Sequence, residues 1–290
     1  MYKAQSFRMH SLLAQRDARY GIEKIKRIVT WRPQCNVLDI GCGTGNVTHD
    51  VLLPILPKST NSIIGVDKLT EFIQYASEQY GKKIVFEQMD IVNCQIPGSN
   101  YEEHFDHIFS FYCLHFVGEQ DLALRNIYRL LKPGGDFFFT CCVRCNGFEA
   151  VTILAETEKW KPSVSDFHKY LCPYQFSSDP KNVLERMLLE TGFKVLQLSI
   201  EPRDTMLPIE FVSGFVLSHS PMELPKDFPS ACVDVLRGWN DVHTKEDNKE
   251  FVCMRYQMIF GHVAVMCFII YIYVSCFIGT GCFVHVKRKM

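Results

Sequence analysis

The stretch VLDIGCGTGN, Val37 to Asn46, limits the fold more than any other part of this chain. A short apolar run leads into three glycines, Gly41, Gly43 and Gly45, as when a buried strand passes into a helix around a nucleotide-like ligand. Glycine lets the backbone turn sharply and approach a ligand closely. The stretch therefore predicts an α/β protein that holds such a ligand at the end of its first strand.

Short β-rich runs alternate with helical patterns after a helical segment at residues 1–30, which predicts a parallel sheet with helices on both faces. The predicted strands are Asn36–Ile40, Ser62–Asp67, Ile84–Gln88, His107–Phe111, Asp136–Cys141, Phe193–Ile200 and Arg255–Val265. The predicted helices between them are Val47–Leu53, Thr70–Tyr80, Asp121–Leu131 and Lys181–Thr191. We expect one domain over residues 1–265, with a ligand-binding core at about 34–142. Segments at about 146–180 and 202–250 are expected to form a cap over the ligand end of the sheet.

Composition argues against nucleic-acid binding and against secretion. The formal net charge is −1, whereas phosphate binding needs clustered Lys and Arg. The N-terminal residues lack the apolar core of a signal peptide, so we interpret the 13 cysteines as reduced thiols in a cytoplasmic protein. Cys142 and Cys145 have C-x-x-C spacing, but no second pair lies at the distance that a structural zinc site needs. No metal site is predicted.

Asp39 decides which ligand suits the glycine loop. A dinucleotide site requires G-x-G-x-x-G, and Asn46 occupies the position of the third glycine. A carboxylate two residues before Gly41 would repel a pyrophosphate but would stabilise a cationic ligand. S-adenosylmethionine (SAM) carries an ammonium and a sulfonium and has no phosphate. The loop therefore favours SAM over NAD.

Two further acids follow predicted strands. Asp67 ends the second strand, where an acid accepts ribose hydroxyls in nucleotide-binding α/β folds. Asp90 ends the third strand and is expected to accept the adenine amino group, with Ile91 packed on the ring. Helix N-capping is the alternative role for an acid at a strand end, and it stays open here. The expected cofactor-binding residues are Asp39, Gly41, Cys42, Gly43, Gly45, Asp67, Lys68, Asp90, Ile91 and Ser110.

The segments VLDIGCGTGN, IIGVD, MDIVN, FDHIFSFYCLHFV and LKPGGDFFF resemble, in this order, the motifs of class I SAM-dependent methyltransferases. QRDA, EKW, CPYQFSSDP and LPKDF narrow the resemblance to insect juvenile hormone acid O-methyltransferases, over about residues 5–265. The resemblance implies a three-layer, Rossmann-like α/β sandwich whose seven-stranded, mostly parallel sheet ends in an antiparallel strand, with a helical cap. It also implies methylation of a small apolar, isoprenoid-like carboxylic acid. Two alternatives stay open: a diverged SAM-binding protein without turnover, and a methyltransferase for a different small molecule.

The end of the fourth strand supplies the predicted catalytic residues. A carboxylate acceptor is already ionised at neutral pH, so methyl transfer to it needs positioning and a dry pocket rather than a strong base. His115 is expected to hold that carboxylate, and Tyr112 or Phe116 to face the sulfonium. The alternatives are loop capping or a place in the core for His115, and core packing for Phe116. The resembling family has Trp at the position of Phe116 and Gln at that of Ala14. Gln15 is the candidate for the role of that glutamine.

The C-terminal run Met266–Val284 contains no Asp, Glu, Lys or Arg, and a basic cluster follows it. As a helix it would be about 28 Å long, which is enough to cross the hydrocarbon core of a bilayer. One expectation is therefore a membrane anchor, with membrane contact through residues 266–284. The alternative is a tail packed on the protein, because Tyr, Val and Ile suit a strand equally well.

Overall fold

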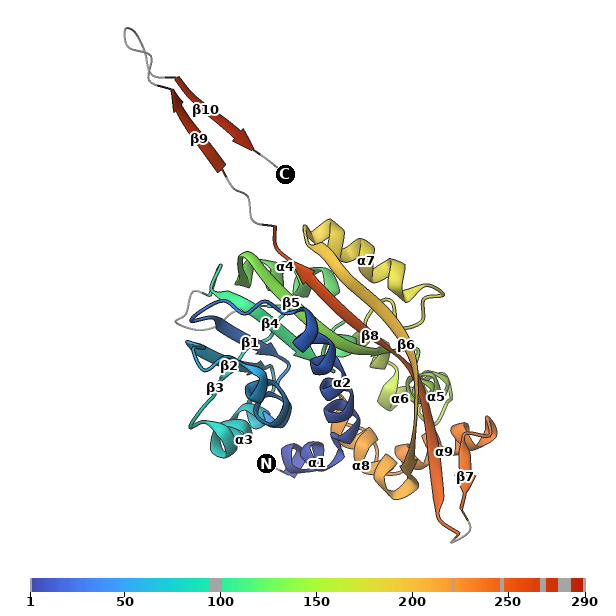
Figure 1. The fold of residues 1–290 in the computed structure, drawn as a ribbon. Helices are drawn as coiled ribbons and strands as arrows, with labels where there is room; N and C mark the ends of the chain where they lie inside the picture. The colour runs from blue at the N-terminus through green and yellow to red at the C-terminus, as the bar shows by residue number, and fades with distance from the viewer. Residues whose placement is uncertain are drawn as a thin grey trace.

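The computed structural model describes residues 2–93, 101–220, 222–245, 248–266, 270–275 and 283–288. Its centre is a sheet in the order β3-β2-β1-β4-β5-β8-β6, with β7 paired to β8 (Figure 1). The strands are β1 Asn36–Ile40, β2 Ser62–Asp67, β3 Val85–Gln88, β4 Phe105–Phe111, β5 Leu131–Val143, β6 Lys194–Pro208, β7 Val242–Thr244 and β8 Glu250–Ala264. Strands β1 to β5 pair in parallel, and β8 is antiparallel to both β5 and β6. The predicted α/β sheet is confirmed, and β7 is a short addition to it.

Helices connect and cover these strands. They are α1 Tyr2–His10, α2 Leu12–Ile28, α3 Thr70–Tyr80, α4 Gln120–Leu130, α5 Asn146–Ala155, α6 Lys161–Val164, α7 Pro180–Thr191, α8 Ile209–His219 and α9 Phe228–Gly238. Four short turns of helix are η1 Thr48–Leu52, η2 Leu53–Ile55, η3 Leu114–Phe116 and η4 Phe167–Tyr170. The helix predicted after the glycine loop is thus a π-helical turn followed by a 3-10 turn. Pro54 explains the change, because it lacks the N–H that a regular helix requires.

The sheet lies between two layers of helices, as the predicted three-layer sandwich requires. Phe137 and Phe139 of β5 pack with α4 and α7, whereas Phe138 packs with α2 and η1. This division follows from the two-residue period of a strand, which sends neighbouring side chains to opposite faces. Burial of both faces also explains why the central strands are apolar at almost every position.

The segments after β5 and β6 gather at one end of the sheet. Cys142, near the carboxyl end of β5, belongs to a buried cluster with residues of α8, α9 and the first half of β8. A second cluster joins α5, α6, η4 and α9. These helices occupy the segments expected to form a cap. We interpret residues 1–265 as one domain on this basis.

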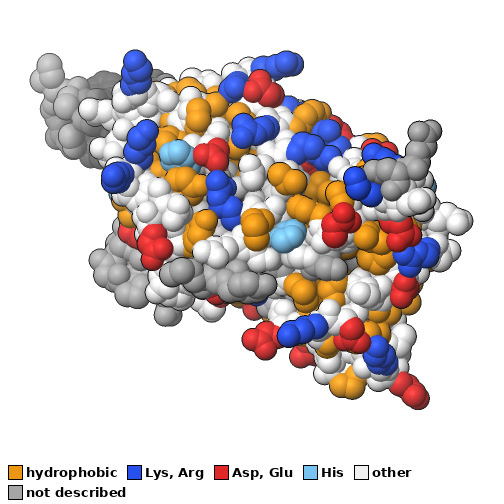
Figure 2. Space-filling view, turned by 90° about the horizontal axis from the view of Figure 1, so that it is seen from below, with side chains coloured by type: hydrophobic (Ala, Val, Ile, Leu, Met, Phe, Trp, Pro, Cys, Tyr) orange, Lys and Arg blue, Asp and Glu red, His pale blue; other side chains and the backbone are white. Residues whose placement is uncertain are grey.

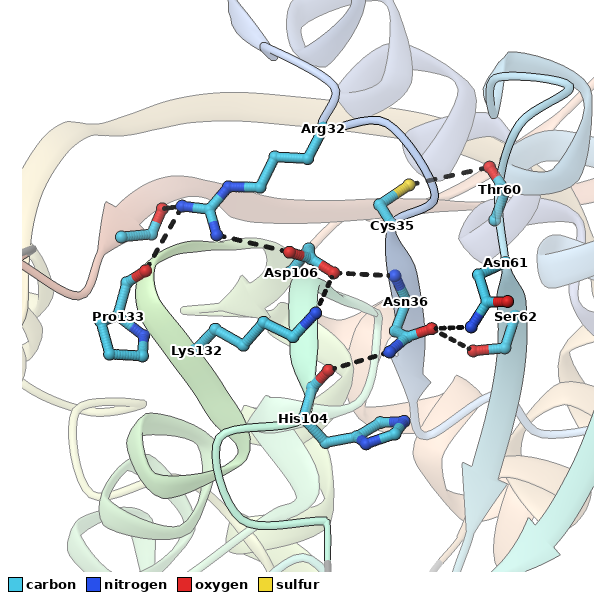
Figure 3. Close-up of polar contacts among 11 residues, drawn as sticks. Arg32, Cys35, Asn36, Thr60, Asn61, Ser62, His104, Asp106, Lys132 and Pro133 are labelled. Carbon is cyan, nitrogen blue, oxygen red and sulfur yellow. Dashed lines mark hydrogen bonds and ion pairs between the residues drawn. The ribbon is translucent and has the colours of Figure 1, made fainter.

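Buried polar contacts fasten the amino ends of β1, β4 and β5 (Figure 3). Asp106 accepts hydrogen bonds from the backbone N of Asn36 at 2.9 Å and from Nζ of Lys132 at 2.7 Å, and it pairs with Arg32 at 3.3 Å. Burial alone would raise the pKa of Asp106, but the bonds and charges of Lys132 and Arg32 lower it below its ordinary value. This end of the sheet is therefore charge-compensated.

The C-terminal run is strand, not helix, where it is described. β9 Ile270–Ser275 and β10 Phe283–Arg288 pair antiparallel, and the described ranges contain no helix long and apolar enough to cross a membrane. The expected helical anchor is therefore not supported. Alternating β-branched and aromatic residues in IYIYVS favour the strand. Positions 267–269 and 276–282 lie outside the described residues.

Candidate functional site

A cavity of about 410 Å³ lies at the carboxyl ends of the parallel strands. The glycine loop after β1, Asp67 at the end of β2 and the Tyr112–His115 segment after β4 line one side of it. Other parts of its wall come from α1, α2, α3, α5, η4, α8, β5 and β8. Open α/β sheets bind ligands in this position, at the point where the strand order reverses. The cavity therefore joins the predicted cofactor loop to the cap.

The glycine loop could not carry side chains at its three glycines. Gly41, Gly43 and Gly45 have φ of +71°, +57° and +76°, a region that other residues rarely adopt. A Cβ on Gly41 would lie 2.3 Å from Sγ of Cys113, and one on Gly45 would lie 2.8 Å from Phe86. Gly41 and Gly43 line the cavity. Gly45 does not line it and instead packs against Phe86 and Ala76.

Asp39 is a buried acid in the cavity wall. It is 1% exposed, and burial raises its pKa to about 7 despite a 2.6 Å hydrogen bond from Oγ1 of Thr48. No Lys, Arg or His of the described ranges pairs with it. A buried carboxylate without a counterion is unfavourable unless a ligand supplies the positive charge. This site therefore fits SAM, whose ammonium would provide that charge.

Asp67 also faces the cavity. Its Oδ2 accepts from the backbone N of Gly43 at 3.1 Å, and its Oδ1 accepts from the backbone N of Leu69 at 2.9 Å. Burial raises its pKa even though these bonds oppose the shift. Each oxygen keeps a second lone pair for a ligand hydroxyl. The N-cap of α3 is Leu69, so Asp67 does not cap that helix.

The other predicted cofactor residues divide into two groups. Asp90 closes a turn by accepting from the backbone N of Val92 at 3.0 Å and lines the cavity, so the structure does not use it as a helix cap. Cys42, Lys68 and Ile91 also line the cavity. Ser110 does not: its buried hydroxyl donates to the backbone O of Ile40 at 3.0 Å and so ties β4 to β1.

His115 lies on η3 and is 2% exposed. Its Nδ1 accepts from the backbone N–H of Cys142 at 3.4 Å. A neutral histidine that accepts at Nδ1 carries its proton on Nε2. Its ring lies 4.3 Å from Phe116 and 6.0 Å from Phe148, measured between centroids. His115 thus lies between the end of β5 and the side chain of Phe148 in α5, and beside Phe116 of its own turn.

The predicted residue Tyr112 leads to a cluster that the sequence did not reveal. Tyr112 has φ of +57°, and its hydroxyl donates to Oδ2 of fully buried Asp17 at 2.5 Å. Tyr256 also donates to Asp17, and Arg16 pairs with it at 2.9 Å. Burial raises the pKa of Tyr112 well above its ordinary value, so this phenol stays protonated. Asp17 belongs to the QRDA segment, which the sequence analysis singled out. Nothing in that segment predicts that Asp17 would contact Tyr112 and Tyr256.

Gln15 is not brought together with His115. Its amide Nε2 donates to Oγ of Ser11 at 3.2 Å, and it does not line the cavity. Ala14 does line it. One residue along a helix is a rotation of about 100°, which explains why neighbours on α2 face different surroundings.

Helix α1 closes one side of the cavity, a role that its sequence did not indicate. Phe7 lines the cavity, and a Cβ on Gly43 would lie 3.0 Å from its ring. Its ring centroid lies 4.7 Å from that of Phe72 in α3. The backbone N of Ala4 donates to Glu71 at 2.9 Å, and α1 packs beside α8 (Figure 1). The N-terminal helix is therefore held on both sides of the site.

Eight hydrophobic side chains that line the cavity belong to, or pack against, the two clusters formed by the segments after β5 and β6, and are here named the apolar end. They are Phe116, Phe148, Val151, Phe167, Phe215, Val216, Leu224 and Met254. Such a surface suits the hydrocarbon part of a ligand and excludes water from a reaction. Outside the cavity, the face in Figure 2 carries acidic and basic side chains interspersed, without a stripe of one sign.

Comparisons with known proteins agree with this geometry. The family profile described as a methyltransferase domain matches residues 32–192. The chain is 28% identical over 244 residues to the juvenile hormone acid O-methyltransferase of Bombyx mori, covering 82% of this chain and 87% of that one. It is also 28% identical over 264 residues to that of Drosophila melanogaster, covering 86% and 87%. The chain belongs to the methyltransferase domain family and is a class I SAM-dependent methyltransferase.

Solved structures support the fold assignment. A candidate methyltransferase of Bacillus halodurans superposes with a TM-score of 0.58 at 15% identity, covering 84% of this chain and 98% of that one. The YcgJ protein of Bacillus subtilis gives a TM-score of 0.56 at 16% identity, covering 85% and 98%. At this level of identity the likeness concerns the fold alone.

Proposed function

We propose that the protein methylates the carboxylate of a small apolar, isoprenoid-like acid such as juvenile hormone acid or farnesoic acid. The observation that carries the proposal is the composition of this cavity. Its acids Asp39, Asp67 and Asp90 suit the cofactor, and its apolar end suits a hydrocarbon chain. His115 lines the same cavity beside Phe116 and Phe148 of the apolar end. The two insect relatives, named for methylation of such an acid, support this choice of acceptor.

The cofactor end is assigned to residues of the three strand ends. Bound SAM supplies an electrophilic methyl group. Asp39 balances its positive charge, Asp67 accepts hydrogen bonds from ribose, and Asp90 accepts one from the adenine amino group. Ile91 packs against the ring. Gly41 and Gly43, which have positive φ and no side chain, let the backbone of the loop come close to the ligand.

The acceptor end is assigned to His115 and the apolar side chains around it. The Nε2–H of His115 donates to the carboxylate and directs one oxygen towards the cofactor. No general base is needed, because the carboxylate is ionised at neutral pH. The protonated Tyr112 serves through its aromatic face rather than as a base. The products are a neutral ester and S-adenosylhomocysteine.

A second candidate function is a SAM-binding protein that has lost this turnover, or one that methylates a different acceptor. Ala14 and Phe116 favour it, because both line the cavity without a side-chain hydrogen-bond donor. The juvenile hormone acid O-methyltransferases that the sequence resembles have Gln at the position of Ala14 and Trp at that of Phe116. In this alternative the residues that bind SAM are kept, and the protein methylates another acceptor or none.

Transfer of label from SAM to a panel of acceptors tests the proposal. The full-length chain is assayed with isoprenoid acids, straight-chain fatty acids and the matched alcohols, and product is identified by mass spectrometry. The proposal predicts methyl esters from apolar acids and none from the alcohols. Protein that binds SAM but forms no ester from any acid would support the second candidate instead. His115→Gln should raise KM for the acid while SAM affinity stays within about twofold.

A further inference from the structure

The C-x-x-C pair of the sequence has no part in the proposed reaction, yet it lies in the wall of the same cavity. Cys142 is in β5 and Cys145 immediately precedes α5, and both line the cavity. Their thiols hydrogen-bond to each other. Arg144, between them, has φ of +50°, which turns the chain back so that the two sulfurs meet.

Buried polar side chains hold this turn in place. Gln175 is fully buried, and its amide oxygen accepts from the backbone N of Arg144 at 2.9 Å and of Cys145 at 3.1 Å. Asn146 donates to Asp241 at 3.0 Å and to the backbone O of Cys253 at 2.9 Å. The strained residue between the cysteines is therefore fixed by its surroundings. The two thiols need no rearrangement of the fold to stay in contact.

The two cysteines differ in acidity. The hydrogen bond from Cys142 lowers the pKa of Cys145, burial opposes this, and the backbone N–H groups of Phe148 and Gly147 lower it further. Burial raises the pKa of Cys142. Cys113 also lines the cavity, but burial raises its pKa to about 12. Cys145 is the N-cap of α5, and backbone N–H groups at the start of that helix favour the ionised form of its sulfur. Cys142 lies within β5 and has no such position.

We propose that Cys145 and Cys142 form an oxidative modification site for small hydroperoxides that enter the cavity. The sulfur of Cys145 attacks the O–O bond, becomes a sulfenic acid, and releases the second oxygen, which takes up a proton and leaves as an alcohol or as water. The sulfur of Cys142 then attacks the sulfenic sulfur, loses its proton and expels water. Two thiols have been oxidised to one disulfide, and the two electrons have reduced one hydroperoxide.

The site is next to the proposed acceptor position. The backbone N–H of Cys142 is the group that bonds Nδ1 of His115, so a disulfide would alter the acceptor end. Asp39 and Asp67 lie on other strands. Oxidised protein should therefore keep its SAM affinity within about twofold, and dithiothreitol should restore the thiols.

The test uses the reduced, full-length chain titrated with hydrogen peroxide, followed by differential alkylation and peptide mass spectrometry. The Cys142–Cys145 disulfide is expected before oxidation of the half-buried Cys253. Cys142→Ser should leave a sulfenic acid on Cys145 that dimedone traps. Cys145→Ser should slow oxidation at Cys142 at least tenfold, whereas the control Cys253→Ser should change neither.

SAM binding is measured for each variant, so a folding failure is recognised. No acceptor is required, and the result is therefore independent of the proposed ester synthesis. Earlier oxidation at Cys113 or Cys253, or dimedone adducts absent from Cys145 in folded Cys142→Ser, would overturn the proposal.

Discussion

Two buried aspartates sit at opposite ends of the same sheet and show opposite behaviour. Asp106, at the amino end of β4, contacts Lys132 and Arg32, and its pKa is below the ordinary value. Asp39, at the carboxyl end of β1, has a hydroxyl from Thr48 for a partner, and burial raises its pKa to about 7. One acid is compensated within the chain. We propose that the other is compensated by the ligand.

The comparison indicates where we expect the ligand-free protein to be less stable because of a residue proposed to bind the cofactor. A pKa that is higher in the folded than in the unfolded state means that folding favours the protonated acid. For Asp39 that favourable state is fully populated below the unfolded value and is lost as pH rises through about 7. At pH 8 the ligand-free protein therefore contains an ionised, buried carboxylate that costs stability.

Asp39→Asn should consequently stabilise the ligand-free protein. At pH 8 the gain in unfolding free energy should be about 2–4 kcal/mol, since one pKa unit corresponds to about 1.4 kcal/mol. It should shrink on acidification and vanish near pH 4. Chemical denaturation at several pH values measures this. An equally large loss of stability at pH 8 would mean that groups within the chain stabilise the ionised form of Asp39. Asp39 and Asp106 would then not differ in this respect.

Asp106→Asn should have the opposite effect. The change removes the charge that Lys132 and Arg32 contact and weakens the bond to the backbone N of Asn36. A loss of about 2–3 kcal/mol in unfolding free energy is expected at pH 7. Denaturation under the conditions used for Asp39→Asn gives the number. An unchanged unfolding free energy in Asp106→Asn would contradict the proposed difference between Asp106 and Asp39.

The affinity for SAM should depend on pH through Asp39. Below pH 7 the acid must lose a proton before it can balance the charge of SAM, so affinity should fall about tenfold from pH 8 to pH 6. Calorimetric titration of wild-type protein provides the curve. In Asp39→Asn this component should be absent, and an unchanged pH profile in that variant would assign the effect to another group.

Thr48→Val should produce the smallest change. It removes the hydroxyl that favours the ionised form of Asp39, so the pKa of Asp39 should rise further. SAM affinity at pH 7 should fall about fivefold, corresponding to a hydrogen bond of about 1 kcal/mol. The deficit should narrow as pH is raised to 9. A deficit that is constant with pH would indicate a packing defect rather than a protonation effect.

The two ends also differ in how well the sequence predicts them. Strands β1 and β2 and helix α3 begin and end where the sequence places them, because glycines and acids mark the strand ends on the ligand side. The acids Asp39 and Asp67 stand in the cavity wall for the same reason. Features of this kind depend on neighbouring residues in the sequence and can therefore be predicted from it.

Features that depend on distant partners were not predictable. β6 continues to Pro208 through the polar residues EPRD because β8 pairs with it along that length. Asp17 acquires its role from Tyr112 and Tyr256, which are far apart in the sequence. In such places tertiary pairing overrides local propensity.

SAM binding by Asp39→Asn and Asp106→Asn at pH 8 tests most directly the claim that the ligand completes Asp39. Calorimetric titration of both full-length variants and the wild type gives the three dissociation constants. Asp39→Asn should bind at least about tenfold more weakly, a change of about 1.4 kcal/mol, while folded Asp106→Asn should match the wild type within about twofold. Equal affinities in wild type and Asp39→Asn would contradict the assignment of the glycine loop and its acid to SAM.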